Sequence, residues 1–178
     1  EGHMLLLPPI LTKDSAYALA DGIIRLREET GLEVFPENPP GHIFLGPLHI
    51  LDFFAIVMER ADTGMLLDLA HLSIYQDFKS LPLTTGLDGF PIDRVVELHM
   101  AGGSTKLHQG LEYIEDDHNP TILPQTWSIF QSIASKLTEL RAVIFECERN
   151  SFESCKTNMI ELRAALDHSL PQASQWRI

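Results

Sequence analysis

The chain has 178 residues, the length of one domain or of a piece of a larger one. Apolar residues make up 44% of it and charged residues 21%, so the chain can bury a core and is unlike intrinsically disordered proteins. Its formal net charge of −12 would repel a phosphate backbone and therefore argues against a nucleic-acid partner.

Other classes of protein are excluded by what the sequence lacks. No apolar run approaches the roughly 20 residues that a membrane span needs. The two cysteines, Cys147 and Cys155, are too few for a disulfide framework or a four-cysteine zinc site. The sequence contains no G-x-S-x-G, Walker or G-x-G-x-x-G motif. It also shows no signal peptide, so we expect a cytoplasmic protein.

The two ends of the chain are set apart from the predicted domain. Residues 1–4, Glu-Gly-His-Met, are typical of the remnant of an expression vector, and we leave them out of the fold prediction. The abrupt start at Leu5 indicates a segment cut from a longer protein. We expect one domain over residues 5–168 and a loose tail over 169–178.

Helices and strands are predicted to alternate along the chain. The first helix begins at Asp14 or Ser15, which can cap its N-terminus, and Gly31 ends it. Helices are predicted over 14–30, 47–61, 72–87 (its second half a loop), 125–140 and 151–166. Extended segments are predicted over 33–36, 65–69, 94–99 and 142–146, and a polar loop follows the third of these, through residues 116–120. This alternation predicts an α/β fold in which helical crossovers connect parallel strands.

Side chains that can bind metals stand at the strand ends or in the loops that follow them. They are Glu37, Asp68, His71, His99, Asp116, His118 and Glu146. In parallel barrels the C-terminal ends of the strands and their loops build the active site. Carboxylate and imidazole ligands without a thiolate suit Fe, Mn or Zn. The sequence therefore predicts a metal site at this edge of the sheet.

Most of these residues also fit a structural role. Glu37 precedes two prolines and fits a helix cap, and His71 and His99 fit core histidines with satisfied hydrogen bonds. Asp116 and His118 fit solvated loop residues. A structural role is least favoured for Asp68, because a lone carboxylate inside an apolar strand is costly unless it is paired or bound to a metal.

Several of these segments together resemble one protein family. They are Glu37-Asn38-Pro39-Pro40, residues 61–72 (ADTGMLLDLAHL), residues 91–102 (PIDRVVELHMAG), Asp116-Asp117-His118 and residues 144–148 (IFECE). In order and spacing they resemble the multinuclear non-heme iron-dependent oxidative enzymes, among them the iron oxidases of methanobactin biosynthesis. The resemblance runs from about Leu5 to Leu166, and the block at 91–102 is its most specific part.

The resemblance implies part of a (β/α)8 TIM barrel of the xylose-isomerase-like type, with about four parallel strands and crossover helices. It implies two or three irons, with Glu37, Asp68, His99, Asp116, His118 and Glu146 as ligands. His71 stands where many members of the family have Asn. The implied reaction is the oxidative modification of a peptide, usually at cysteine, and a separate peptide-binding protein often delivers the substrate.

The matching part is only the C-terminal portion of the family barrel, because such a barrel needs about 250 residues. A piece with four strands has two open sheet edges, so we expect self-association. Two other functions stay open. A sugar isomerase or epimerase would use Glu37 and Glu146 to bridge one divalent metal, Mn or Zn in place of Fe. A truncated barrel without catalysis would serve as a binding scaffold.

Overall fold

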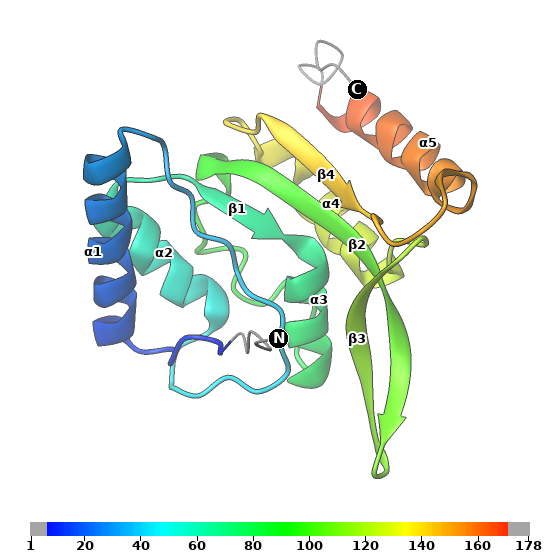
Figure 1. Ribbon diagram of the computed structural model, residues 1–178, viewed down its shortest axis with the longest axis horizontal. Coiled ribbons are helices and arrows are strands. Elements are labelled where there is room, and N and C mark those ends of the chain that lie inside the picture. Colours follow the sequence, from blue (N-terminus) through cyan, green and yellow to red (C-terminus); the bar gives the residue numbers. More distant parts are fainter. Residues whose placement is uncertain (1–6, 171–178) are drawn as a thin grey trace.

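Three parallel strands run through the middle of the protein, of which a computed structural model describes residues 7–170 (Figure 1). They are β1 (Met65–Asp68), β2 (Val95–His108) and β4 (Ala142–Glu146), and β2 lies between the other two. The register places Asp68 beside His99 and Ala101 beside Glu146. The C-terminal ends of β1 and β4 therefore lie beside residues 99–101 of β2 at one edge of the parallel sheet, and β2 continues beyond it.

Helices connect and cover these strands. Within residues 7–170 they are α1 (Lys13–Thr30), α2 (Ile50–Ala61), α3 (Leu69–Phe78), α4 (Pro124–Ile133) and α5 (Phe152–Ser169), with short 3-10 turns at Ile92–Arg94 and Ala134–Lys136. Helix α3 connects β1 to β2, and α4 lies between β2 and β4 in the chain. The predicted α/β class, with parallel strands and helical crossovers, is confirmed.

Local sequence signals explain where two of the helices begin or end. Gly31 ends α1 as predicted, in the left-handed conformation with φ 69°. The N-cap of α1 is Thr12, whose side chain accepts a hydrogen bond from the Ser15 amide, rather than Asp14 or Ser15. Helix α3 begins at Leu69, earlier than predicted, because Asp68 ends β1 and caps the helix at once.

The region predicted as a polar loop is an antiparallel hairpin, so that prediction was wrong. Strand β3 (Leu111–Asn119) pairs with the second half of β2, and the hairpin projects from the rest of the protein (Figure 1). Gln109 and Gly110 form the tip with φ of 50° and 83°, as tight two-residue hairpin turns require. Both faces of this hairpin mix polar and apolar side chains and neither is buried in the core, so its sequence lacks the clear alternation that predicts a strand.

The sheet is open at both sides, as expected for part of a barrel. Within residues 7–170 no strand pairs with the outer edge of β4. On the other side, the predicted extended segment before Glu37 contributes only one parallel bridge, from Glu37 to Leu66. The fourth parallel strand is thus reduced to a single bridge, and the architecture is that of a partial TIM barrel whose sheet is not closed.

The apolar core lies on the helix-covered side of the sheet. Leu67 of β1 and Leu98 and Met100 of β2 are completely buried there. Side chains alternate across a strand, so Glu97 and His99 lie on the opposite side, where the interior of a barrel would be. The sheet thus has one apolar face and one face whose C-terminal end is polar.

No helix in residues 7–170 combines the length and the apolar character needed to cross a membrane. Residues 1–4, predicted as a vector remnant, lie outside the described residues. Of the predicted tail, Ser169 ends α5 and Leu170 is buried, and residues 171–178 lie outside the described part.

Candidate metal centre

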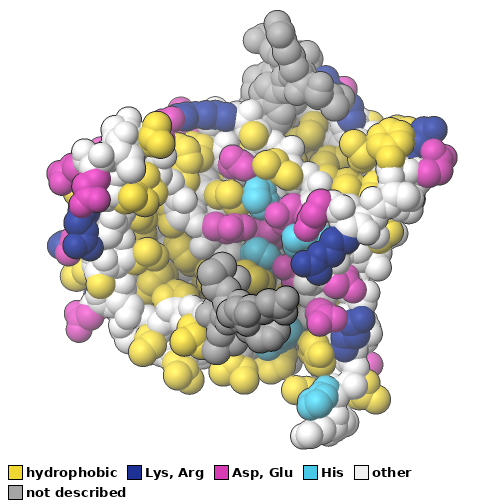
Figure 2. All heavy atoms as spheres, in the orientation of Figure 1, with side chains coloured by type: hydrophobic (Ala, Val, Ile, Leu, Met, Phe, Trp, Pro, Cys, Tyr) yellow, Lys and Arg dark blue, Asp and Glu magenta, His cyan; other side chains and the backbone are white. Residues whose placement is uncertain are grey.

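The predicted ligands gather where the parallel strands end. Figure 2 shows acidic and histidine side chains together near the middle of this face of the protein. Asp68 comes from the end of β1, His99 from β2 and Glu146 from the end of β4. Glu37 comes before β1 in the chain and forms a parallel bridge with Leu66. His71 lies in the first turn of α3.

Asp68 is the most deeply buried member of the cluster, with no exposed surface. Its Oδ1 atom accepts a hydrogen bond of 2.7 Å from the His71 amide and so caps α3. Asn38, also fully buried, exchanges two hydrogen bonds of 2.8 Å with the Asp68 backbone. The carboxylate is thereby fixed in place, and its Oδ2 atom is left without a hydrogen-bond partner.

Two groups of ligand-type atoms meet at Asp68. Glu37, Asp68 and His71 each offer one such atom, and these atoms lie within 4.8 Å of one another. Asp68, His99 and Glu146 form a second group by the same measure. A carboxylate that belongs to both groups has the lone pairs to contact two cations at once.

Asp116 and His118 join the cluster from the base of the hairpin. The β2–β3 register shifts between Gly102 and Ser104, where residues 116–118 bulge out of the ladder. Bulges re-aim side chains in this way beside many active sites. The Asp116 Oδ2 atom lies 3.0 Å from His71 Nε2, and His118 Nε2 lies 3.7 Å from Glu146 Oε2.

The conformation of His118 is unusual. Its φ of 52° lies in the left-handed region, which non-glycine residues seldom adopt. The Asn150 side chain donates a hydrogen bond of 2.6 Å to the His118 carbonyl and supports this conformation. Strained backbone held by its surroundings is typical of functional sites.

Several buried atoms of the cluster have no hydrogen-bond partner. They are Asp68 Oδ2, His99 Nδ1, Asp116 Oδ1 and Glu146 Oε2. Buried polar atoms are nearly always satisfied, because an unpaired one costs about 1–3 kcal/mol. Most of these atoms lie 3.3–3.9 Å from an oppositely charged group of the cluster without forming a hydrogen bond. Oxygen and imidazole nitrogen atoms spaced in this way fit a bound cation of the Fe, Mn or Zn type. The residues present therefore fit a metal.

The surrounding carboxylates raise the pKa values of two histidines in the cluster. Burial opposes protonation of His71, but a hydrogen bond to Asp116 and the charges of Asp68 and Asp116 outweigh it and raise its pKa to about 9. For His99, burial is outweighed by Glu146, Glu37 and Glu97, which raise its pKa to about 11. Burial also raises the pKa of Asp68. In the absence of a metal, the protonated rings of His71 and His99 therefore balance part of the negative charge of these carboxylates.

We expect the metal-free protein to lose stability as the pH rises. The folded state holds protons on His71 and His99 that the unfolded chain releases near pH 6.5. Their stabilisation is complete below pH 6.5 and is lost as the pH passes through about 9 and about 11. Urea unfolding with a chelator at pH 6, 8 and 10 checks this, and His71→Asn should flatten the slope up to pH 9. A free energy of unfolding that rises from pH 7 to pH 10 would contradict the expected sign.

Three residues around the cluster were not predicted as site residues. Asn38 belongs to the Glu37-Asn38-Pro39-Pro40 segment, but its sequence position alone does not predict its hydrogen bonds with the Asp68 backbone. Glu97 lies 3.1 Å from His99 Nε2, and its position two residues before His99 on one strand face could have revealed it. Glu148 lies 2.8 Å from His118 Nδ1, and no signal in the sequence joins these two residues.

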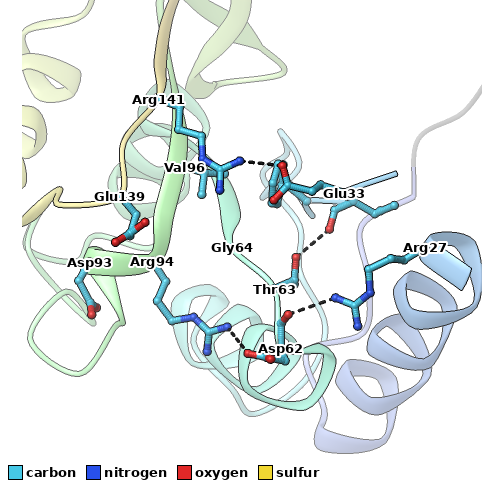
Figure 3. A pocket seen from close by; sticks show the side chains of 12 residues that line it. Arg27, Glu33, Asp62, Thr63, Gly64, Asp93, Arg94, Val96, Glu139 and Arg141 are labelled. Atoms are coloured by element: carbon cyan, nitrogen blue, oxygen red, sulfur yellow. Dashed lines mark hydrogen bonds and ion pairs between the residues drawn. The ribbon is translucent and has the colours of Figure 1, made fainter. Parts of the chain in front are cut away.

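A separate cavity of about 440 Å³ lies at the opposite end of the strands (Figure 3). It contains three arginines, each with a partner. Arg94 pairs with Asp62 at 2.9 Å, Arg141 pairs with Glu33 at 2.7 Å, and Arg27 donates to the Asp62 carbonyl at 3.1 Å. Its polar groups tie the N-terminal ends of the strands to α1 and α2, away from the metal-capable cluster.

Comparison with known protein families gives a match over nearly the whole chain. The family described as "RiPP precursor modification enzyme MbnB/TglH/ChrH" matches residues 2–167. The chain is 26% identical to a UPF0276 protein of Rhizorhabdus wittichii over 140 residues, which cover 78% of this chain and 49% of that protein. It is 24% identical to a UPF0276 protein of Acaryochloris marina over 147 residues, with coverages of 80% and 52%.

A third relative matches over a similar share of this chain. A UPF0276 protein of Vibrio parahaemolyticus is 25% identical over 134 residues, which cover 73% of this chain and 46% of that protein. The chain thus spans about half the length of the curated relatives it matches. Since the family match takes in nearly the whole sequence, the chain belongs to the RiPP precursor modification enzyme family MbnB/TglH/ChrH.

Proposed function

We propose that this chain carries part of the metal centre of an enzyme that uses iron to oxidise a ribosomally made peptide at a cysteine side chain. Family membership supports a peptide substrate. The structural observation that carries the proposal is the set of buried carboxylate and imidazole atoms that lie together without hydrogen bonds at the end of the parallel sheet. Such a set suits iron as well as Mn or Zn, and of these iron is the common redox metal.

The chain's own residues divide the work. Asp68, His99 and Glu146 would hold one ion, and Glu37 and His71 would share Asp68 in holding another. Asp116 and His118 would complete the site from the hairpin. When bound, iron supplies Lewis acidity and one-electron redox chemistry, with molecular oxygen as the oxidant.

Protons and access are set by the same residues. His71 Nε2 and His99 Nδ1 must give up their protons before they can act as ligands, so loading the site releases protons. The Glu37 side chain is 39% exposed, whereas that of Asp68 is fully buried. In this chain the cluster is therefore open to solvent on the Glu37 side.

Metal analysis of the anaerobically purified, iron-loaded chain tests the proposal. We expect two or more irons per chain, oxygen uptake when a cysteine-containing peptide is added, and an unchanged iron content in the control Glu112→Gln at an exposed position of β3. Retention of Mn, Mg or Zn alone, without oxygen uptake, would contradict the iron oxidase and favour the isomerase class. Failure of both this chain and a longer chain of the relatives' length to hold metal would contradict any metalloenzyme.

A delivering protein and self-association are also part of the proposal. Exposed apolar side chains near the open β4 edge support an interface there: Ile144 is 43% exposed and Phe152 68%. Light scattering that gives a monomer mass at high concentration would contradict self-association.

A further inference from the structure

We propose that Glu97 and Glu148 are positioning residues that decide which ring nitrogen His99 and His118 turn towards the metal. The inference rests on the proposed metal centre and adds to it two carboxylates outside the predicted ligand set. Each would accept a hydrogen bond from the nitrogen that faces away from the centre. Histidine ligands commonly donate their second N–H to a carboxylate or a carbonyl, which fixes the tautomer and the ring orientation.

His99 has two unlike sides. Its Nε2 atom is hydrogen-bonded to Glu97 Oε1 at 3.1 Å. Its Nδ1 atom has no hydrogen bond and lies 3.3 Å from Glu146 Oε1 and 3.5 Å from Glu37 Oε1. Donor atoms that share an ion at about 2.1 Å each lie about 3.0–3.5 Å apart. The Nδ1 side therefore has the spacing of a shared cation, and the Nε2 side has a hydrogen bond.

His118 repeats this arrangement with its nitrogens exchanged. Its Nδ1 atom contacts the Glu148 carboxylate at 2.8 and 2.9 Å. Its Nε2 atom faces the centre, 3.7 Å from both Asp116 Oδ2 and Glu146 Oε2. The strained φ of 52° and the hydrogen bond from Asn150 to the His118 carbonyl fix the backbone from which the ring projects.

His71 follows the same rule with a backbone acceptor. Its Nδ1 atom lies 2.8 Å from the Asn38 carbonyl, and its Nε2 atom lies 3.0 Å from Asp116 Oδ2. A carbonyl can only accept, so Nδ1 carries the proton and Nε2 is left for a ligand. The cluster would thus bind through Nε2 of His71, Nδ1 of His99 and Nε2 of His118, a specific assignment that an experiment can check.

Glu97 and Glu148 are held close enough to act but are outside the two ligand groups. Glu97 projects from β2 on the same face as His99, two residues earlier, and its side chain is 29% exposed. Glu148 follows β4 and its side chain is 60% exposed. Because neither is buried in the core, both can be replaced without opening a cavity.

Zn(II) binding by the full chain tests the assignment. We expect Glu97→Ala to weaken Zn(II) binding about 10- to 100-fold. Glu97→Gln should restore most of the affinity, because its Oε1 atom can accept the same hydrogen bond. The matched control Glu112→Ala, at an exposed position of β3, should change the affinity less than about twofold. The same series at Glu148 should act through His118.

Nitrogen-15 NMR of the Zn(II)-loaded chain supplies a readout that a merely structural role would not move. We expect His99 to keep its proton on Nε2 and His118 to keep its proton on Nδ1, with the His99 proton exchanging faster in Glu97→Ala. Metal on His99 Nε2, or equal affinities for Glu97→Ala and the wild type, would overturn the inference while leaving the metal centre standing. If neither the wild-type chain nor a longer chain of the relatives' length binds Zn(II), Fe(II) or Mn(II), both the inference and the metal centre are overturned.

Discussion

Asp68→Asn is expected to lower metal affinity by at least about 100-fold while leaving the fold intact. Asp68 belongs to both groups of ligand atoms, so its loss removes a charge from each. Asparagine caps a helix as well as aspartate does, so the bond to the His71 amide survives. Equilibrium dialysis with Fe(II) and Zn(II) measures the change.

The stability of the Asp68→Asn variant distinguishes a role of Asp68 as a metal ligand from a purely structural role. Burial raises the pKa of Asp68, so the charged carboxylate is unfavourable in the metal-free fold. We therefore expect metal-free Asp68→Asn to be at least as stable as the wild type at pH 8. Asp68→Ala should lose about 1 kcal/mol more than Asp68→Asn, because the cap is lost as well. Asp88→Asn, at an exposed loop position, is the control. Unchanged metal binding in Asp68→Asn would mean that the carboxylate serves only the helix.

The parallel part of the fold could be predicted because its signals are local. Strand β4 has the predicted bounds, and β1 differs by one residue. Gly31 and the prolines mark element ends through backbone restrictions that act within a few residues. The hairpin could not be predicted, because its pairing depends on the Gln109–Gly110 turn and on a ladder in which neither face is buried in the core.

The sequence could predict which residues form the site, but not how their side chains are arranged. The rule that strand ends meet brings Asp68, His99 and Glu146 together without any knowledge of their contacts. The rule also covers the loops after strands and so includes Asp116 and His118, but it does not predict that they reach the cluster through a bulge in a hairpin. It also cannot say which histidine nitrogen faces the centre, because Glu148 and His118 are 30 residues apart and meet only in the fold.

The open side of the cluster agrees with the length of the relatives. About half of each curated relative lies outside the match. Glu37 and Ile144 are partly exposed on the face where a barrel interior would be. Completion of that face by further strands would bury Glu37 and lower the dielectric around the centre, which would strengthen its electrostatic interactions.

Gly102→Ala is expected to reduce the free energy of unfolding by about 3 kcal/mol and to displace the hairpin ligands. A Cβ atom at Gly102 would press into the carbonyl oxygens of Thr121 and Asn119 and come within 2.9 Å of Asn119 Cβ. These neighbours are mostly backbone and cannot move aside as a flexible side chain would. Asn119 directly follows His118 and Thr121 comes two residues later, so relief of the clash shifts the bulge that carries Asp116 and His118.

A glycine elsewhere in the chain provides the matched control for Gly102→Ala. Gly22 lies inside α1, where an added Cβ atom would meet nothing within 4 Å, so Gly22→Ala should stabilise the protein by about 0.5–1 kcal/mol. Urea unfolding of both variants measures the opposite signs, and Zn(II) binding should weaken only in Gly102→Ala. A Gly102→Ala protein with wild-type stability and affinity would show that the hairpin base yields freely, and that the bulge does not hold Asp116 and His118 in place.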